Sequence, residues 1–166
     1  MVFTLIGMPG SGKSCMSKSM ADKISIRTVD SDRLIELREG KKLCEIIRDV
    51  GNDGFKKIEE ETLLGISDED LLLATGGSAV YSESAMKHLK QVGKVIYLYV
   101  SFETMLERIG DYSARGIIIR PDQTIRDLYD ERTHLYEKYA DITINVTEQT
   151  IEQSVQAVAE ALKGAL

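Results

Sequence analysis

Short apolar runs alternate with longer segments of helical periodicity along the whole chain. The apolar runs predict strands at residues 2–6, 26–30, 71–75, 95–100 and 142–146. Apolar residues spaced three and four apart predict helices at 15–24, 33–38, 82–91, 103–109, 124–139 and 150–162. Run 71–75 is almost wholly apolar, which is typical of a strand buried on both faces of a sheet. The alternation predicts an α/β fold with a parallel sheet.

The segment between the second and third predicted strands is an exception to this regular alternation. Residues 39–69 are mostly polar and helical in pattern, with breaks expected at Gly40, Gly51, Gly54 and Gly65. We therefore expect an insertion at about 31–66. Leu43, Ile46, Ile47 and Val50 form one apolar face, whereas Lys57, Glu60 and Glu61 are interpreted as a solvated face with ordinary pairs of opposite charge.

Composition bounds the class of protein. The chain has 166 residues, a length that fits a single domain (1–166) with one core, and a net charge of −6. This charge argues against a broad nucleic-acid surface, because such binding needs extended Lys and Arg contacts to phosphates. The sequence shows no apolar run of membrane-spanning length and no signal peptide, so we expect a cytoplasmic protein. Cys15 and Cys44 lie outside any metal-binding pattern and are expected to be small buried hydrophobes.

Residues 7–14 carry the most specific chemical signal. Their sequence GMPGSGKS fits the Walker A pattern and lies between a predicted strand and a predicted helix, as its mechanics require. In such a loop the backbone N–H groups and the helix N-terminus bind phosphates. Lys13 can reach the β- and γ-phosphates of a nucleotide, and the Ser14 hydroxyl can bind Mg²⁺. The motif therefore predicts binding of ATP with Mg²⁺.

Two further clusters follow predicted strands, at the edge where open parallel sheets bind ligands. Asp30 and Asp32 end the second strand, and beside a phosphate loop they are candidates for metal and substrate binding. The alternative is that this acidic stretch only caps the next helix. Gly76 and Gly77 follow the third strand, where a tight turn could present backbone N–H groups to a substrate, although a glycine pair is by itself only a turn signal.

Segment 110–123 is interpreted as a mobile lid. Gly110, Gly116 and Pro121 interrupt any helix there, while Arg115 and Arg120 could bring positive charge to the phosphates and exclude water. The alternative is a surface loop with solvated arginines.

Taken together, these motifs resemble the shikimate kinases in order and spacing over nearly the whole chain. The matching residues are the phosphate loop, Asp30-x-Asp32, Gly54-Phe55-Lys56, Ala74-Thr75-Gly76-Gly77, the lid arginine and Arg132-x-x-x-Tyr136. The resemblance implies a three-layer P-loop fold with a five-stranded parallel sheet in the order 2-3-1-4-5. It also implies ATP-dependent phosphorylation of a hydroxyl on a small carboxylic acid, with shikimate the leading candidate.

The resemblance also assigns roles to individual residues. Lys13, Asp32 and Arg115 are implied to be catalytic, and Asp30 is implied to join Ser14 at the metal. The implied ATP-binding residues are Gly10, Ser11, Gly12, Lys13, Ser14, Cys15, Arg108 and Arg115. The implied substrate-binding residues are Asp32, Lys56, Gly76, Gly77, Ser78 and Arg132. Arg120-Pro121 also looks like the family's lid pair, but its spacing to Arg132 is short, so we assign the lid arginine to Arg115.

The sequence departs from the family pattern around the acceptor. Lys56 stands where the family has an arginine, and Lys lacks the planar fork that binds a carboxylate in a bidentate manner. Ser78 replaces the third glycine of the turn, and the lid reads Arg115-Gly116-Ile117-Ile118. Another small hydroxy acid, a polyol or a nucleoside monophosphate therefore stays an alternative acceptor, and a non-catalytic nucleotide-binding module stays an alternative function. We expect a monomer that binds neither nucleic acid nor a membrane.

Overall fold

Strands and helices alternate from end to end in the computed structural model, which describes residues 1–67, 70–111 and 117–165. The strands are β1 (Val2–Ile6), β2 (Arg27–Asp30), β3 (Leu71–Ala74), β4 (Gly93–Tyr99) and β5 (Ile142–Asn145). The helices are α1 (Lys13–Ile24), α2 (Ser31–Glu39), α3 (Leu43–Leu64), α4 (Glu83–Val92), α5 (Phe102–Ile109), α6 (Ile125–Tyr139) and α7 (Ile151–Ala165). A short 3₁₀ helix, η1 (Ala79–Tyr81), which the sequence pattern did not predict, lies between β3 and α4.

The five strands form one parallel sheet in the order β2-β3-β1-β4-β5, so the predicted strand order is confirmed. β1 and β3 lie in the interior of this sheet, and every residue of both strands is buried. Ala74 pairs with Leu5 on one side and with Asp30 on the other. This register brings the ends of β1, β2 and β3 to one edge of the sheet, which is where the predicted chemical residues lie.

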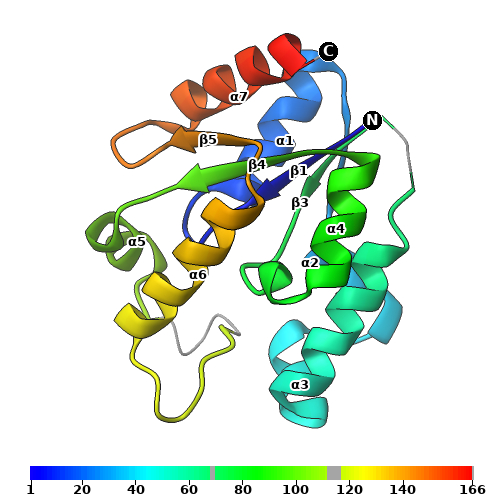
Figure 1. Ribbon diagram of the computed structural model, residues 1–166, viewed down its shortest axis with the longest axis vertical. Helices are drawn as coiled ribbons and strands as arrows, with labels where there is room; N and C mark the ends of the chain where they lie inside the picture. The colour runs from blue at the N-terminus through cyan, green and yellow to red at the C-terminus, as the bar shows by residue number, and fades with distance from the viewer. Residues whose placement is uncertain (68–69, 112–116, 166) are drawn as a thin grey trace.

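Helices cover both faces of the sheet, as Figure 1 shows. α1 and α7 pack together on one face, and α4 and α6 cover the other. The main core between these layers contains, for example, Leu5, Met16, Leu72, Ile96 and Leu128, all fully buried. The predicted three-layer α/β architecture is therefore confirmed.

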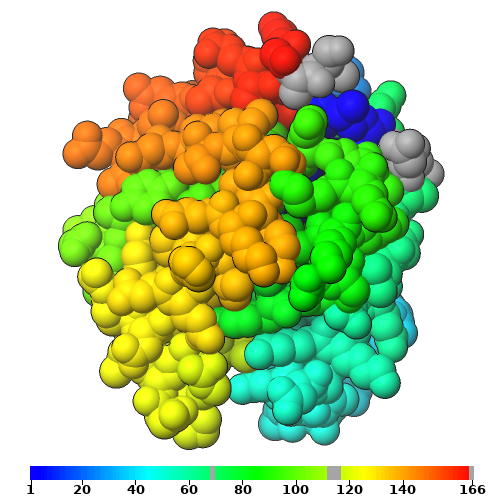
Figure 2. Space-filling model, in the orientation of Figure 1, coloured from blue at the N-terminus to red at the C-terminus, as the bar shows by residue number. Residues whose placement is uncertain are grey.

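The predicted insertion is a pair of helices, α2 and α3, which pack against each other. Gly40 ends α2 at a φ of 68°, and Gly51 kinks α3 at a φ of 74°, a backbone region that favours glycine. The break expected at Gly54 was wrong, because the helix continues through it. A small apolar cluster of Ile35, Ile46, Phe55 and Ile118 joins the two helices to the segment after residue 116. Figure 2 shows an indentation between α3 and the chain segment that leads into α6.

The expectation that both cysteines are buried was wrong. Cys15 and Cys44 are both exposed, because each lies on the outer side of its helix while neighbouring apolar residues such as Met16 and Ile46 turn inward. Among the described residues, no helix has the length and apolar character needed to cross a membrane.

Candidate active site

The phosphate loop connects buried β1 to α1. Gly10 and Gly12 have φ values of 82° and 92°, which side chains with a Cβ rarely adopt. Gly10 also lies against α5: a Cβ there would be 2.9 Å from Ile109 Cγ2 and 3.2 Å from Arg108 Cβ. The loop leads directly into the N-terminus of α1, where an anion binds well.

Lys13 folds over this loop. Its Nζ donates to the carbonyl oxygens of Gly7 at 2.6 Å and Met8 at 2.9 Å, and to Ser11 Oγ at 3.3 Å. Burial of the ammonium lowers the pKa of Lys13 to about 8, although the nearby Asp32 carboxylate opposes the shift. A phosphate bound beside this ammonium would raise the pKa of Lys13 again, because a nearby opposite charge favours the charged form.

Asp30 caps α2 and also contacts the residue that ends the phosphate loop motif. Its Oδ1 accepts hydrogen bonds from the backbone N–H groups of Asp32 at 3.0 Å and Arg33 at 3.3 Å, which caps α2. Its Oδ2 accepts from Ser14 Oγ at 2.6 Å. A carboxylate beside a hydroxyl is the oxygen donor set that Mg²⁺ uses together with nucleotide phosphates. The described residues contain no cluster of three or more acidic, His or Cys ligands.

Asp32 and Glu59 lie on either side of Gly76. A Cβ at Gly76 would be 2.7 Å from Asp32 Oδ1 and 2.7 Å from Glu59 Oε1, so any larger residue would displace these carboxylates. Burial, reinforced by the Asp30 carboxylate, raises the pKa of Asp32 to about 6. In the described part of the chain no group donates a hydrogen bond to the Asp32 carboxylate, which leaves it available to a ligand hydroxyl.

Glu59 has a place at the site that the sequence pattern did not predict, since its neighbours Lys57, Glu60 and Glu61 were interpreted as a solvated face. The side chain is only 2% exposed, because the helical phase of α3 turns it toward the end of β3. Its Oε2 accepts from Ser78 Oγ at 2.6 Å, and its Oε1 has no partner among the described residues. Burial raises the pKa of Glu59 to about 7, although the Ser78 hydrogen bond and the nearby cations oppose the shift. Lys57 and Glu61 are exposed as predicted.

Glu59 makes the stability of the folded chain depend on pH. Its pKa is about 7 when folded against 4.5 unperturbed, so folding binds a proton between these values. Stability therefore falls as pH rises through this window. We expect Glu59→Gln to raise the free energy of unfolding at pH 8 by on the order of 2 kcal/mol, and to leave it unchanged near pH 4. Urea titrations at both pH values measure this, with exposed Glu61→Gln as the control; equal effects at both pH values would contradict it.

Arg132 and Tyr136 hold the turn after Gly76 from the other side. Tyr136 OH donates to the carbonyl oxygen of Gly77 at 2.6 Å, and a Cβ at Gly77 would be 2.7 Å from Arg132 Nη1. The Arg132 side chain is 1% exposed, and its Nη2 donates to the Ile118 carbonyl oxygen at 2.9 Å. A buried guanidinium thus lies across the sheet edge from Asp32.

These residues surround a cavity of about 420 Å³. Most predicted site residues line it, namely Gly10, Gly12, Lys13, Ser14, Cys15, Asp32, Gly76, Gly77, Ser78 and Arg132. The cavity is also lined by residues that were not predicted to belong to the site, namely Pro9, Leu43, Phe55, Thr75, Ile117 and Ile118. The cavity has the size and mixed lining of a small-molecule site.

Three other predicted residues lie behind or beside this cavity. Ser11 belongs to the phosphate loop, but its side chain is buried and its Oγ accepts from Lys13. Arg108 donates from Nη1 to the Gly10 carbonyl oxygen at 3.3 Å and from Nη2 to that of Val146 at 3.1 Å, which joins the phosphate loop to the end of β5. Lys56 lies with its Nζ 4.3 Å from the centre of the Tyr81 ring and lines a smaller neighbouring cavity of about 160 Å³.

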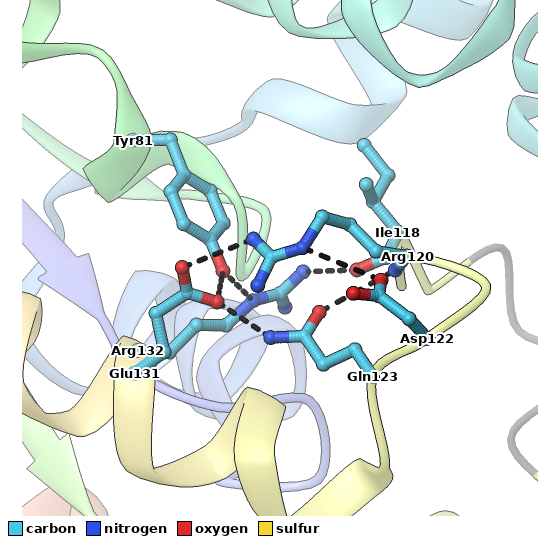
Figure 3. Close-up of polar contacts among 7 residues, drawn as sticks. All are labelled: Tyr81, Ile118, Arg120, Asp122, Gln123, Glu131 and Arg132. Atoms are coloured by element: carbon cyan, nitrogen blue, oxygen red, sulfur yellow. Dashed lines mark hydrogen bonds and ion pairs between the residues drawn. The ribbon is translucent and has the colours of Figure 1, made fainter.

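Arg115 and Arg120 are the two arginines of the predicted lid. Arg115 lies outside the described residues. Arg120 donates from Nη1 to Glu131 Oε1 at 3.2 Å, as Figure 3 shows. Arg120 therefore belongs to a polar cluster with α6, whereas the assignment of Arg115 to the phosphates stays a prediction.

Comparison with known proteins agrees with this geometry. A model of the family described as shikimate kinase matches residues 9–163. The chain belongs to the shikimate kinase family. It is 34% identical over 160 residues to the shikimate kinase of Sulfurihydrogenibium sp. (strain YO3AOP1), with 96% of each protein covered. It is 35% identical over 162 residues to that of Pasteurella multocida (strain Pm70), covering 95% of this chain and 93% of the relative.

Solved structures give the same result. The fold is similar to that of a shikimate kinase from Acinetobacter baumannii in complex with shikimate, with a TM-score of 0.87, 29% identity and coverage of 98% of this chain and 93% of that one. It is also similar to the shikimate kinase of Aquifex aeolicus vf5, with a TM-score of 0.85, 32% identity and coverage of 99% and 97%. The predicted family, fold and enzyme class are confirmed: the chain is an ATP-dependent phosphotransferase that acts on a hydroxyl group.

Proposed function

We propose that the protein transfers the γ-phosphoryl group of ATP to a hydroxyl group of shikimate, with Mg²⁺ as the metal. The observation that carries this proposal is the shared cavity, which Lys13, Asp32 and Arg132 all line. This reaction needs three groups: a cation that binds phosphate, a carboxylate that can accept from a hydroxyl, and a buried guanidinium that can bind a carboxylate. The Acinetobacter baumannii relative was solved in complex with shikimate, which supports the choice of acceptor.

The nucleotide end of the cavity is assigned to the phosphate loop. The N–H groups of Gly10 to Cys15 bind the phosphates, and Lys13 leaves the loop carbonyls to offset the charge on the transferring group. Ser14 and Asp30 would hold Mg²⁺, which would supply positive charge to offset that of the phosphates. Arg108 supports the loop from α5, and Arg115 adds positive charge from the lid, about 110–123.

The acceptor end is assigned to the edge formed by β2, β3 and α6. Asp32 accepts a hydrogen bond from the acceptor hydroxyl and takes its proton as the new P–O bond forms and the bond between the γ-phosphorus and the ADP oxygen breaks, so that ADP leaves. Arg132 binds the acceptor carboxylate, with Lys56 adding positive charge nearby. Gly76, Gly77 and Ser78 form the wall between these groups, so the acceptor is fixed at both of its ends, and this positioning supplies much of the rate.

We further propose that one domain, residues 1–166, performs the reaction as a cytoplasmic monomer, with 31–66 as the acceptor-binding insertion. The support for this proposal is that both ends of the cavity are built from the same chain around one main core.

The test is a coupled assay of ADP release across several acceptors. Shikimate, other small hydroxy acids, polyols and nucleoside monophosphates are compared at saturating ATP and Mg²⁺. We expect saturable turnover with shikimate and little with the others. Turnover of another acceptor alone would leave a kinase of this fold with a different substrate, which the Lys56 and Ser78 departures would explain. Nucleotide binding without transfer to any acceptor would favour the regulatory module.

Arg132→Lys tests the carboxylate assignment. Lysine keeps the charge but loses the planar fork, so we expect KM for shikimate to rise by about 10-fold or more while KM for ATP stays within about twofold. Steady-state kinetics with each substrate varied in turn measures the difference. A matched control is exposed Arg126→Lys on the same helix; a rise in both KM values in Arg132→Lys would argue against the assignment.

A further inference from the structure

The Glu131 carboxylate accepts hydrogen bonds from parts of the chain that are far apart in sequence. Its Oε2 accepts from Tyr81 OH at 3.2 Å and from Gln123 Nε2 at 2.6 Å, and its Oε1 accepts from Arg120 Nη1 at 3.2 Å. Figure 3 shows the three donors converging on this carboxylate. Partial burial alone would raise the pKa of Glu131, but the three donors hold it below its usual value, so the group is ionised at neutral pH.

Arg132, the next residue on α6, is held by the same regions. Its Nε donates to Tyr81 OH at 3.4 Å and its Nη2 to the Ile118 carbonyl oxygen at 2.9 Å. The Tyr81 hydroxyl thus accepts from Arg132 while it donates to Glu131. Ile118 is in turn fixed by its buried side chain in the small cluster that joins α2 and α3. Two of the three guanidinium nitrogens are therefore oriented by η1 and by segment 117–123.

The Tyr81 ring also contacts both cations that are assigned to the acceptor. Lys56 Nζ lies 4.3 Å from the ring centre and Arg132 Cζ lies 5.5 Å from it. Cations at such distances are attracted to the aromatic face. Rotation of Tyr81 would therefore disturb both cations at once, and its hydroxyl bond to Glu131 opposes that rotation.

We infer that Glu131 is a positioning residue for recognition of the acceptor carboxylate, and that it acts by holding Tyr81, Arg120 and Gln123 around the Arg132 guanidinium. This inference rests on the proposed function, since it concerns an acceptor that carries a carboxylate. A guanidinium binds a carboxylate well only when its planar fork faces the ligand, so small rotations reduce affinity and selectivity. The Arg120–Glu131 ion pair should add little to the stability of the fold, because the Arg120 side chain is 59% exposed. We therefore expect a change at Glu131 to alter acceptor binding more than folding.

Two conservative variants test the inference: Tyr81→Phe removes the hydroxyl and keeps the ring, and Glu131→Gln removes the charge and keeps the shape. Shikimate is compared with its methyl ester, which lacks the negative charge. We expect the preference for shikimate, as the ratio of kcat/KM values, to fall about 5- to 10-fold in each variant, with kcat on shikimate and KM for ATP within about twofold. The double variant should match the stronger single variant, because both changes break one connection.

The control is Asp130→Asn, which breaks the ion pair with Arg126 on the exposed side of the same helix and should leave the preference unchanged. A general loss of structure would lower kcat/KM for both acceptors equally and keep their ratio, so an unchanged ratio overturns the inference. A fully additive double variant overturns it as well. If the wild-type chain does not prefer shikimate to the ester, the proposed function itself has failed.

Discussion

Replacement of Lys13 by alanine is expected to lower kcat by about 10³-fold or more, to the limit of a coupled assay. The Lys13 ammonium lies over the phosphate loop, held by the Gly7 and Met8 carbonyl oxygens. Phosphoryl transfer spreads negative charge over the oxygens of the transferring group, and a cation fixed beside them stabilises that charge more than it stabilises bound ATP. The loss should therefore be much larger in kcat than in ATP affinity, which calorimetry with Mg²⁺ measures separately.

Lys18→Ala is the matched control for this variant, because Lys18 is an exposed lysine on the same helix. It should keep normal kcat. Thermal unfolding of Lys13→Ala, measured beside that of the wild-type chain, shows whether loss of the hydrogen bonds to Gly7 and Met8 destabilises the fold. Near-normal turnover in Lys13→Ala would disprove the assignment of the phosphate loop as the catalytic site.

The sheet could be predicted from sequence because its strands are short apolar runs with clear limits. β1 is found where it was predicted, and the other strands shift by no more than two residues at either end. Caps account for the differences at the starts of α4 and α6: Ser82 and Thr124 were counted as helical, whereas their side chains accept from the N–H groups of Ala85 and Asp127. The strand order depended on the family resemblance, because strand patterns alone do not determine which strands are neighbours.

Site residues that are contiguous in sequence were predictable, and those created by packing were not. The phosphate loop is read from one stretch of the chain. Glu59 looked like its charged neighbours, and only the rotation of α3 against β3 brings it to Ser78. The contact of Tyr81 with Glu131 spans 50 residues and carries no local signal. One clue to Glu59 was available in the sequence: it is a polar residue on the face of an amphipathic helix that turns inward.

Replacement of Asp32 by asparagine is the second change with a large expected effect, a fall in kcat of about 10³-fold. Asp32 lies in the first turn of α2, where the helix N-terminus favours its negative charge, and it lines the cavity with Lys13. Asparagine has the same size but cannot take a proton from the acceptor hydroxyl. Because the described residues donate no hydrogen bond to this carboxylate, the substitution should leave its surroundings in place and act on the reaction alone.

Single-turnover kinetics and calorimetry together separate the chemical role of Asp32 from a binding role. We expect shikimate affinity in Asp32→Asn to fall by less than about 10-fold, because the amide still hydrogen-bonds to the acceptor, while the chemical step slows by the full factor. Asp53→Asn, an exposed change in α3, serves as the control and should alter neither quantity. If the chemical step kept its rate while affinity fell, Asp32 would only bind the acceptor. The proton would then leave the hydroxyl without a carboxylate base, and positioning and charge from Lys13 and the phosphate loop would carry the catalysis.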